Sequence, residues 1–217
     1  MTIHHRVIVC GESRSFPTAH KLTESAGDTA EVLVLIGDRA GAALNDIADR
    51  ARYAAILVEL GNECLGVHTG EGRGREGGNV LGFNRFRLGE ADPSDLVELV
   101  RQPATPESAI AAAKSVLEAA GLSVALCGDF AGRIIDRLVR PYYNAALRRL
   151  DEGLATADDM DLTLRLGLGY PEGPIALLEK TGLARHFEVS RDLFEALGEA
   201  AYAPARRARV AAERQGK

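Results

Sequence analysis

The segment from Phe130 to Leu183 constrains the fold of this chain more than any other part of the sequence. From Gly132 to Leu150 apolar residues recur every three or four positions, which is the spacing of a helix with one buried face. Gly153 is a natural end for this helix, and Thr156 predicts the N-cap of a second helix that ends at Gly167. The predicted buried stripe consists of Ile134, Leu138, Tyr142 and Ala145, together with Ile135, Val139, Ala146 and Leu150.

A corner rich in glycine and proline follows the second predicted helix. It contains Gly169, Pro171, Gly173 and Pro174. Because the fixed φ of proline suits the first turn of a helix, Pro174 predicts the start of a third helix. Residues 129–217 are therefore expected to form an all-α domain.

The order of these residues resembles the C-terminal domain of the 3-hydroxyacyl-CoA dehydrogenase family, whose enzymes are NAD-dependent and act in fatty-acid β-oxidation and related acyl-CoA pathways. In that family a helix with the pattern G-F-x-x-N-R-x-x-x-P-Y-x-N-E-A precedes the patterns E-G-x-A, D-x-D and G-x-G-x-P-x-G-P. The residues in register include Gly132, Arg137, Pro141, Tyr142, Asn144, Glu152, Gly153, Asp159, Asp161, Gly167, Gly169, Pro171, Gly173 and Pro174.

The resemblance implies that this helical domain supplies a dimer interface and one wall of an acyl-CoA cleft. We therefore expect a homodimer and an acyl-CoA ligand. Apolar residues beyond the first helix support a dimer, because a domain of this size cannot easily bury all of them alone. These residues are Leu177, Leu178, Leu193, Phe194 and Leu197.

Composition excludes several other classes of protein. No apolar run approaches the ~20 residues of a membrane-spanning helix, and the N-terminal sequence MTIHHRV has no signal-peptide core. The cysteines Cys10, Cys64 and Cys127 lack metal-ligand spacing. The net charge is −5, which does not favour nucleic acid as a partner. We expect a cytoplasmic protein with reduced thiols and no metal.

Residues 1–128 are expected to form the nucleotide-binding half. Strands are predicted at Arg6–Cys10, Glu31–Ile36, Ala54–Leu60, Val80–Phe83, Leu96–Val100 and Ser123–Cys127, and helices at Thr18–Ser25, Gly41–Arg52 and Pro106–Ala120. These are too few βα units for a complete doubly wound domain. The predicted fold class is α/β plus all-α, with a reduced Rossmann-like domain over residues 1–128 and a helical domain over residues 129–217.

The turn after the first predicted strand departs from a dinucleotide-binding turn. Such a turn needs several glycines, because the backbone must approach the pyrophosphate and present it to a helix N-terminus. The turn at 11–16 has one glycine, Gly11, and Glu12 adds a negative charge. Asp38 is either the acid that binds the cofactor ribose or an acid of a surface turn. NAD is the cofactor that the family implies, and this turn argues against its binding.

A glycine-rich segment runs from Gly66 to Gly82 and contains His68, Arg73 and Arg75. One interpretation is a mobile linker that replaces a lost helix. The other is a phosphate cradle built from backbone N–H groups and arginine.

The family resemblance also identifies catalytic positions. In the family a His held by a Glu takes the hydroxyl proton as the hydride leaves. Asn84 stands at the position of the His, and Glu98 stands at the position of the Glu. An amide cannot act as this base. Glu98 is retained, and we expect Arg85 or Arg87 to hold it.

Two positions that contact the substrate in the family are altered. The family's Ser corresponds to Cys64, and its Asn corresponds to Asp136. We expect Arg133 or Arg137 to neutralise Asp136. Alternatively, Asp136 is a replacement base whose pKa is raised by burial. His68 is the other candidate for a replacement base.

Two functions remain open. The first is a family member in fatty-acid and acyl-CoA metabolism that has lost most or all NAD-dependent oxidation of 3-hydroxyacyl-CoA. The alternative is a divergent but active NAD-dependent 3-hydroxyacyl-CoA (3-hydroxybutyryl-CoA) dehydrogenase, in which Glu98, Asp136 or His68 carries the acid–base chemistry. Binding of NAD discriminates between them.

Overall fold

The computed structural model describes residues 4–24 and 30–216, and the chain divides into two compact units. Unit 1 comprises Met1–Arg87 and Pro93–Arg133, and unit 2 comprises Leu88–Asp92 and Ile134–Lys217. The predicted boundary lay between residues 128 and 129. The loop at 88–92 joins unit 2 because Glu90 N–H donates to the Thr181 carbonyl at 2.8 Å.

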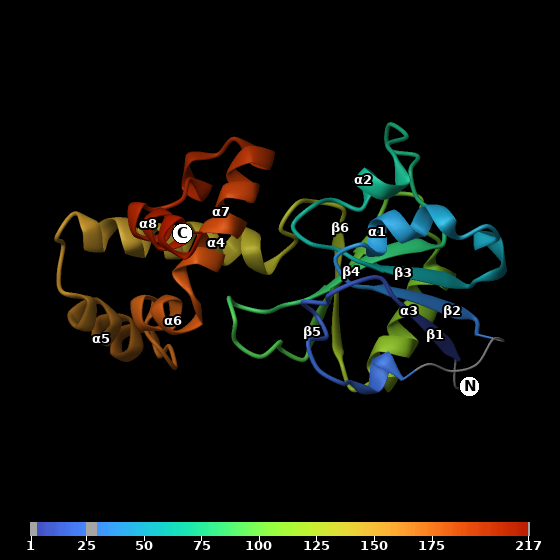
Figure 1. Ribbon diagram of the computed structural model, residues 1–217, viewed down its shortest axis with the longest axis horizontal. Coiled ribbons are helices and arrows are strands. Elements are labelled where there is room, and N and C mark those ends of the chain that lie inside the picture. Colours follow the sequence, from blue (N-terminus) through green and yellow to red (C-terminus); the bar gives the residue numbers. More distant parts are fainter. Residues whose placement is uncertain (1–3, 25–29, 217) are drawn as a thin grey trace. The chain divides into compact units, whose positions relative to one another are not determined.

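Unit 1 is built on one six-stranded sheet with the order β1-β2-β3-β4-β5-β6 (Figure 1). The strands are β1 (His5–Val9), β2 (Val32–Ile36), β3 (Ala55–Glu59), β4 (Val80–Arg85), β5 (Leu96–Arg101) and β6 (Ser123–Gly128). All six lie where the sequence predicts strands. Neighbouring strands are parallel except for the antiparallel pair β4 and β5. A doubly wound sheet binds its ligand where the strand order reverses. Among the described strands this order does not reverse.

The helices of unit 1 are shorter than predicted. The predicted helix at 18–25 is only the 3₁₀ turn η1 (Lys21–Thr23) within the described residues, and Ser25 lies outside them. The predicted helix at 41–52 is broken into α1 (Ala40–Ala43), η2 (Leu44–Asp46) and η3 (Arg50–Arg52). Asn and Asp, which favour turns over helix interiors, explain the break at 45–49. The glycine-rich segment contains the short helix α2 (Gly66–Thr69), and α3 (Glu107–Ala119) forms as predicted.

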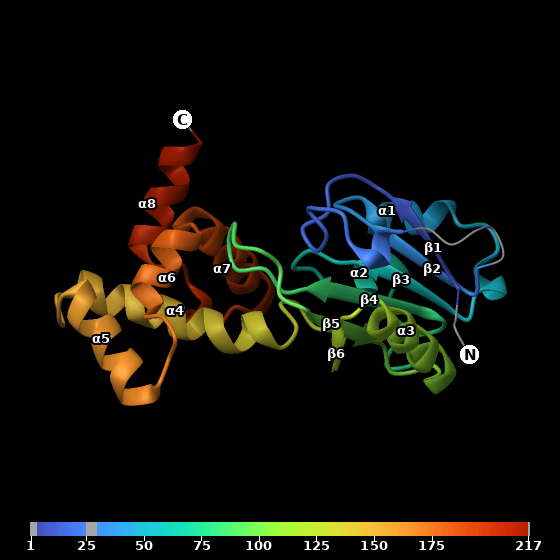
Figure 2. The ribbon, with the colours of Figure 1, turned by 90° about the horizontal axis from the view of Figure 1, so that it is seen from below.

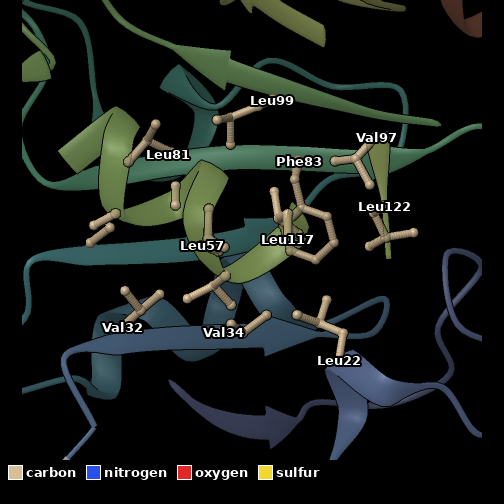
Figure 3. Close-up of a cluster of buried hydrophobic side chains, with 14 of the residues drawn as sticks. Leu22, Val32, Val34, Leu57, Leu81, Phe83, Val97, Leu99, Leu117 and Leu122 are labelled. Atoms are coloured by element: carbon tan, nitrogen blue, oxygen red, sulfur yellow. The ribbon is translucent and has the colours of Figure 1, made fainter. Parts of the chain in front are cut away.

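Both faces of the sheet are buried. Figure 3 shows the face covered by α3, where Leu117 packs with strand residues such as Val34, Leu57 and Phe83. On the other face α1 and the segments that follow it cover the alternate residues Leu33, Leu35, Ile56 and Val58. In Figure 1, α1 and α2 lie on the face opposite α3. A sheet covered on both faces needs continuous apolar strands, which β2 and β3 provide.

Unit 2 is all helical, with α4 (Ile135–Asp151) in contact with α6, α7 and α8 (Figure 2). The other elements are α5 (Ala157–Leu168), α6 (Pro174–Thr181), α7 (Leu183–Leu197), η4 (Ala200–Tyr202) and α8 (Arg206–Gln215). The predicted fold class is thus confirmed. Within the part of the chain that the structure describes, no helix is both long and apolar enough to cross a bilayer.

The predicted breaks between the helices are largely confirmed. The Thr156 hydroxyl accepts the Asp159 N–H at 3.1 Å and caps α5, and Pro174 occupies the first turn of α6. The predicted end of α5 at Gly167 is wrong. The helix continues to Leu168 and ends at Gly169, whose φ of +71° a glycine adopts without strain.

The predicted buried stripe of α4 is wrong except at Ala146, which is buried. Leu138 is 70% exposed and Ile134 is exposed, while the buried face consists of Asp136, Arg140, Tyr143, Asn144, Ala146 and Leu147. Polar side chains can occupy a buried face only when their hydrogen bonds are satisfied. Asp136 and Arg140 satisfy each other within α4, and further partners of Arg140 and Asn144 come from α7, more than forty residues away along the chain.

Some of the residues predicted to form the dimer surface are buried. Leu178 and Leu193 are fully buried within unit 2, so they cannot contribute to an interface. Phe194 remains exposed. The larger exposed apolar set lies on and around α5, and its members are Leu154, Leu162, Leu166, Leu168 and Tyr170.

Candidate functional site

The strand register of unit 1 brings Asn84 and Glu98 together. They are directly opposite each other on the antiparallel strands β4 and β5. Residues opposite each other in such a pair project from the same face with their Cβ atoms about 4.5–5.5 Å apart. The Asn84 amide donates to the Leu60 carbonyl at 2.8 Å, which ties β4 to the end of β3. The Asn84 side chain is therefore already used for structure.

Glu98 forms a buried ion pair that the sequence did not predict. Arg133 Nε lies 3.6 Å from Glu98 Oε2, and each side chain is only 2% exposed. Arg133 Nη2 also donates to the Gly61 carbonyl at 2.6 Å. The predicted partner Arg85 instead pairs with Asp95 at 3.0 Å. The signal for Arg133 was present in the sequence, because the family pattern has Phe at this position.

Arg133 adopts an unusual backbone conformation. Its φ is +51°, a region that non-glycine residues seldom occupy. Its buried Nε and Nη1 have no hydrogen-bond partner among the described residues. Such a conformation persists only where surrounding contacts impose it. The contacts to Glu98 and Gly61 provide that constraint.

Cys64 lies in the loop after β3, near Asp129 and Arg133. Burial raises the pKa of the Cys64 thiol, and the charge of Asp129 raises this pKa further. The Asp129 carboxylate accepts the N–H groups of Leu65 and Gly66 at 2.6 and 2.8 Å. Cys64 is therefore a protonated thiol at neutral pH, beside a carboxylate that caps α2.

Asp136 lies in unit 2 and is part of its buried interior. Its Oδ1 accepts from Arg140 Nε at 2.7 Å, so the partner is Arg140 and not the predicted Arg133 or Arg137. Arg140 and Asp136 are one turn apart on α4. The Asp136 carboxylate is thus already engaged by a buried guanidinium within unit 2.

The same arginine continues into a network whose hydrogen positions can be assigned. Arg140 Nη1 lies 3.0 Å from His186 Nδ1. Since arginine only donates, Nδ1 must accept, and Nε2–H therefore donates to Asn144 Oδ1 at 2.9 Å. Burial lowers the pKa of His186 to about 3, and the charge of Arg140 lowers this pKa as well. His186 is neutral at physiological pH.

Ser190 completes this network but does not make it catalytic. The Asn144 amide donates to Ser190 Oγ at 3.3 Å and to the Tyr202 carbonyl at 3.2 Å. Ser190, His186 and Asn144 are almost completely buried, so no substrate reaches the Ser hydroxyl. The network is a structural device of unit 2. Sequence reasoning missed His186 and Ser190 because nothing local marks them.

The predicted cofactor residues Gly11 and Asp38 lie together in the loops after β1 and β2. A Cβ on Gly11, whose φ is +117°, would fall 1.9 Å from Asp38 Oδ1. Asp38 N–H donates to the Glu12 carbonyl at 2.9 Å. Gly11 therefore permits loop packing, and within the described residues 11–20 that follow β1 no helix begins. The arrangement of strand, glycine and helix occurs instead after β2, where Gly37 precedes α1.

The space at this second turn is filled by side chains. A Cβ on Gly41 would fall within 2.4 Å of the His68 imidazole, so His68 uses the room that this glycine leaves. His68 Nε2 lies 3.3 Å from Glu63 Oε1. Glu59, at the end of β3 and buried, accepts the Gly37 N–H at 2.6 Å and the Ser15 N–H at 2.8 Å. The residues present do not fit a dinucleotide pyrophosphate, because the backbone donors after β1 and β2 already bind a carboxylate.

In the glycine-rich loop, too, a carboxylate of the chain binds the backbone N–H groups that were considered for a phosphate. Glu76 Oε2 accepts the N–H groups of Gly72 and Gly74, both at 2.9 Å. Hydrogen bonds from backbone N–H groups, first that of Glu76 itself and then that of Gly72, lower the pKa of Glu76. The phosphate cradle considered for this loop is thus occupied by the loop's own carboxylate. Among the described residues, no group of His, Cys, Asp and Glu could hold a metal ion.

Unit 2 contains a pocket of about 920 Å³ between α4, α5 and α6. The Tyr142 hydroxyl is buried without a hydrogen-bond partner in the described part of the chain, and burial raises the pKa of Tyr142 to about 12. Tyr142 and Tyr170 rings meet edge to face at 6.0 Å. The apolar lining includes Val139, Tyr142, Tyr143, Leu162, Tyr170, Pro171, Pro174 and Leu177.

Comparison with known proteins points to one family. Residues 132–217 match the family model of the 3-hydroxyacyl-CoA dehydrogenase C-terminal domain. A 3-hydroxybutyryl-CoA dehydrogenase of Mycobacterium tuberculosis is 34% identical over 126 residues, 58% of this chain and 43% of the relative. The enzyme of that name from Bradyrhizobium diazoefficiens is 33% identical over 110 residues, 51% of this chain and 38% of the relative. The chain thus spans less than half the length of these relatives.

Solved structures show the corresponding fold. FadB2 from M. tuberculosis matches with a TM-score of 0.67 and 24% identity over 86% of this chain and 66% of that chain. A 3-hydroxybutyryl-CoA dehydrogenase from Escherichia coli K12 matches with a TM-score of 0.56 and 26% identity over 74% of this chain and 32% of that chain. The similarity to the 3-hydroxyacyl-CoA dehydrogenase family is thus strongest in the C-terminal domain, which residues 132–217 match.

Proposed function

We propose that this chain has lost most or all NAD-dependent oxidation of 3-hydroxyacyl-CoA and acts as a non-catalytic member of its family in cytoplasmic acyl-CoA metabolism. The observation that carries the proposal is the position of Asn84, directly opposite Glu98 on β4 and β5. Proton removal needs a base at this point, and an amide cannot supply it. The loss of a general base alone costs about 10²–10⁴ in rate.

The cofactor side of the site supports the same proposal. NAD binds through backbone N–H groups that are free to donate to its pyrophosphate. The N–H groups of Ser15 and Gly37 already donate to Glu59, and His68 fills the space over Gly41. Glu98 is held by Arg133, so it cannot orient a base as freely as in the family.

Calorimetry with the purified chain tests this proposal. We expect the dissociation constants for NAD and NADH to be about millimolar or weaker. This corresponds to a binding free energy no more favourable than ~−4 kcal/mol. Reduction of acetoacetyl-CoA with NADH should stay far below the ordinary enzyme range of about 1–10³ s⁻¹. A micromolar dissociation constant for NADH would overturn the proposal.

One observation favours the alternative of a divergent active dehydrogenase. His68 and Glu63 lie 3.3 Å apart, which reproduces a His held by a Glu at another place in unit 1. In that case wild-type turnover would be measurable, and His68→Gln would abolish it while Asn84→Ala would leave it unchanged. If neither turnover nor NADH binding is found, the alternative fails.

We also propose that the chain forms a homodimer through unit 2 and retains affinity for an acyl-CoA ligand. The exposed apolar side chains of α5 adjoin the pocket between α4, α5 and α6, and Leu162 belongs to both. Exposed apolar patches of this kind mark interaction sites. Light scattering at micromolar concentration should give a dimer mass.

A further inference from the structure

The loops at the carboxyl ends of β1 and β2 converge on one buried carboxylate at the end of β3. Glu59 Oε1 accepts the Ser13 hydroxyl at 3.0 Å and the Ser15 N–H at 2.8 Å, and Oε2 accepts the Gly37 N–H at 2.6 Å. The Glu59 side chain extends from the last residue of β3. The donors come from the loops after the other two strands, so one side chain joins three segments that are distant in sequence.

The charge of Glu59 is balanced by hydrogen bonds. No ion pair involves Glu59 within the described residues, although the residue is only 7% exposed. A buried carboxylate without a cation is stable only when donors surround it, and converging backbone N–H groups do this in anion-binding nests. The Ser13 oxygen in turn accepts the Phe16 N–H at 2.8 Å, which fixes the direction of its own proton toward Glu59.

We propose that these loops form a binding site for a small carboxylate, and that Glu59 is its built-in ligand. The donors are divided between two oxygens of one planar group, which matches a carboxylate better than a tetrahedral phosphate. An external anion and Glu59 compete for the same donors, so the site is closed in the native chain. Removal of the Glu59 side chain opens it to formate or acetate.

This inference deepens the proposed function, because it explains why the loops do not hold the phosphates of a cofactor. Its test is independent of Asn84 and of any cofactor. Thermal unfolding is measured for the native chain, for Glu59→Ala and for Glu76→Ala, each in sodium chloride, formate, acetate or phosphate at equal ionic strength. Glu76 is the matched control, because it also accepts two backbone N–H groups but is only partly buried.

We expect Glu59→Ala to lower Tm by roughly 10 °C, since three donors lose their acceptor. Formate at about 0.5 M should restore around half of that loss, more than acetate and far more than phosphate, because a ligand that binds only the folded state stabilises it. The native chain and Glu76→Ala should show the same small shift in all four salts. Equal Tm values for Glu59→Ala in formate and chloride would overturn the proposal.

A second measurement applies if Glu59→Ala does not fold. In the native chain, NMR should show the Ser15 and Gly37 amide protons shifted downfield and slow to exchange, as expected for bonds to a charged acceptor. Glu59→Gln keeps the shape but removes the charge, so both signals should move upfield and exchange at least tenfold faster. Unchanged signals would refute the assignment. NADH binding by the native chain would overturn the proposed function but leave these results intact.

Discussion

Unit 2 begins its helices where local signals in the sequence place them, whereas unit 1 forms the predicted strands but carries Asn84 where the family resemblance implies a base. In unit 2, Thr156 and Pro174 begin helices where the sequence predicts them. In unit 1, Asn84 and Glu98 are still opposite each other, but only Glu98 retains its chemical type. Backbone geometry is fixed by many residues together, while proton transfer depends on single side chains.

The two units also bury charge differently. Unit 2 holds Asp136, Arg140 and His186 in one connected network in which the donors and acceptors can be assigned. Unit 1 holds Glu59 by neutral donors and pairs Glu98 with Arg133, two of whose nitrogens have no partner within the described residues. The interior of unit 2 therefore depends more strongly on its charges than the candidate site of unit 1 does.

The largest effect should follow from breaking the network of unit 2. Arg140→Met leaves the Asp136 carboxylate without its cation and His186 Nδ1 without a donor, so we expect a loss of about 3–5 kcal/mol in the free energy of unfolding. Asn84→Ala, in unit 1, removes one hydrogen bond and should cost about 1 kcal/mol. Urea denaturation of both variants measures the difference. Equal losses would contradict the contrast between the units.

A second prediction concerns pH. The unfolded chain binds a proton at His186 near pH 6.5, whereas the folded chain does not bind it until about pH 3. Unfolding therefore takes up a proton between these values, and stability falls as pH falls through this window, by up to ~1.4 kcal/mol per pH unit. Denaturation curves from pH 7 to pH 4 should show this slope. His186→Gln, which cannot gain a charge, should flatten it, and an unchanged slope would contradict the burial of a neutral imidazole.

The elements that sequence predicted well are those set by local signals. Strands such as Val32–Ile36 are short apolar runs, and Thr156, Gly169 and Pro174 act on their immediate neighbours. The buried face of α4 was predicted wrongly because Arg140 and Asn144 are polar, and only their contacts with His186 and Ser190 make burial favourable. Those partners are distant in sequence, so no periodicity reveals them.

The candidate site shows the same limit. The family pattern located Asn84 and Glu98 correctly relative to each other. It did not identify Arg133 as the partner of Glu98, because a positive φ and a buried ion pair depend on the loop at Gly61. Glu59 was missed because its donors belong to two other loops.

The third prediction tests the exposed surface of unit 2. Leu166→Glu places a charge among the exposed leucines of α5, so the proposed dimer should weaken by at least about tenfold, or ~1.4 kcal/mol. Sedimentation equilibrium measures the change. Val67→Glu is the control, because Val67 is equally exposed but lies on α2 of unit 1. A dimer that survives Leu166→Glu would require a different interface.

A smaller effect is expected at the start of α5. Thr156→Ala removes the acceptor for the Asp159 N–H and should cost about 1 kcal/mol. Thr163→Ala is the matched control, because the Thr163 hydroxyl only donates back to the Asp159 carbonyl at 2.8 Å and its loss should be nearly neutral. Chemical denaturation compares the two. A larger loss for Thr163→Ala would show that this hydroxyl, and not the cap, supports the helix.

The smallest effect is expected from restoring the His that the family resemblance implies at position 84. Asn84→His places an imidazole opposite Glu98, yet we expect no measurable reduction of acetoacetyl-CoA with NADH. Arg133 already holds Glu98, and the donors needed for a pyrophosphate bind Glu59.

Adding Arg133→Phe, the residue of the family pattern, should free Glu98 and raise the pKa of the new imidazole, because a carboxylate favours the charged form. NMR titration measures that pKa in the single and double variants. Activity from Asn84→His alone would show that unit 1 had lost nothing except its base.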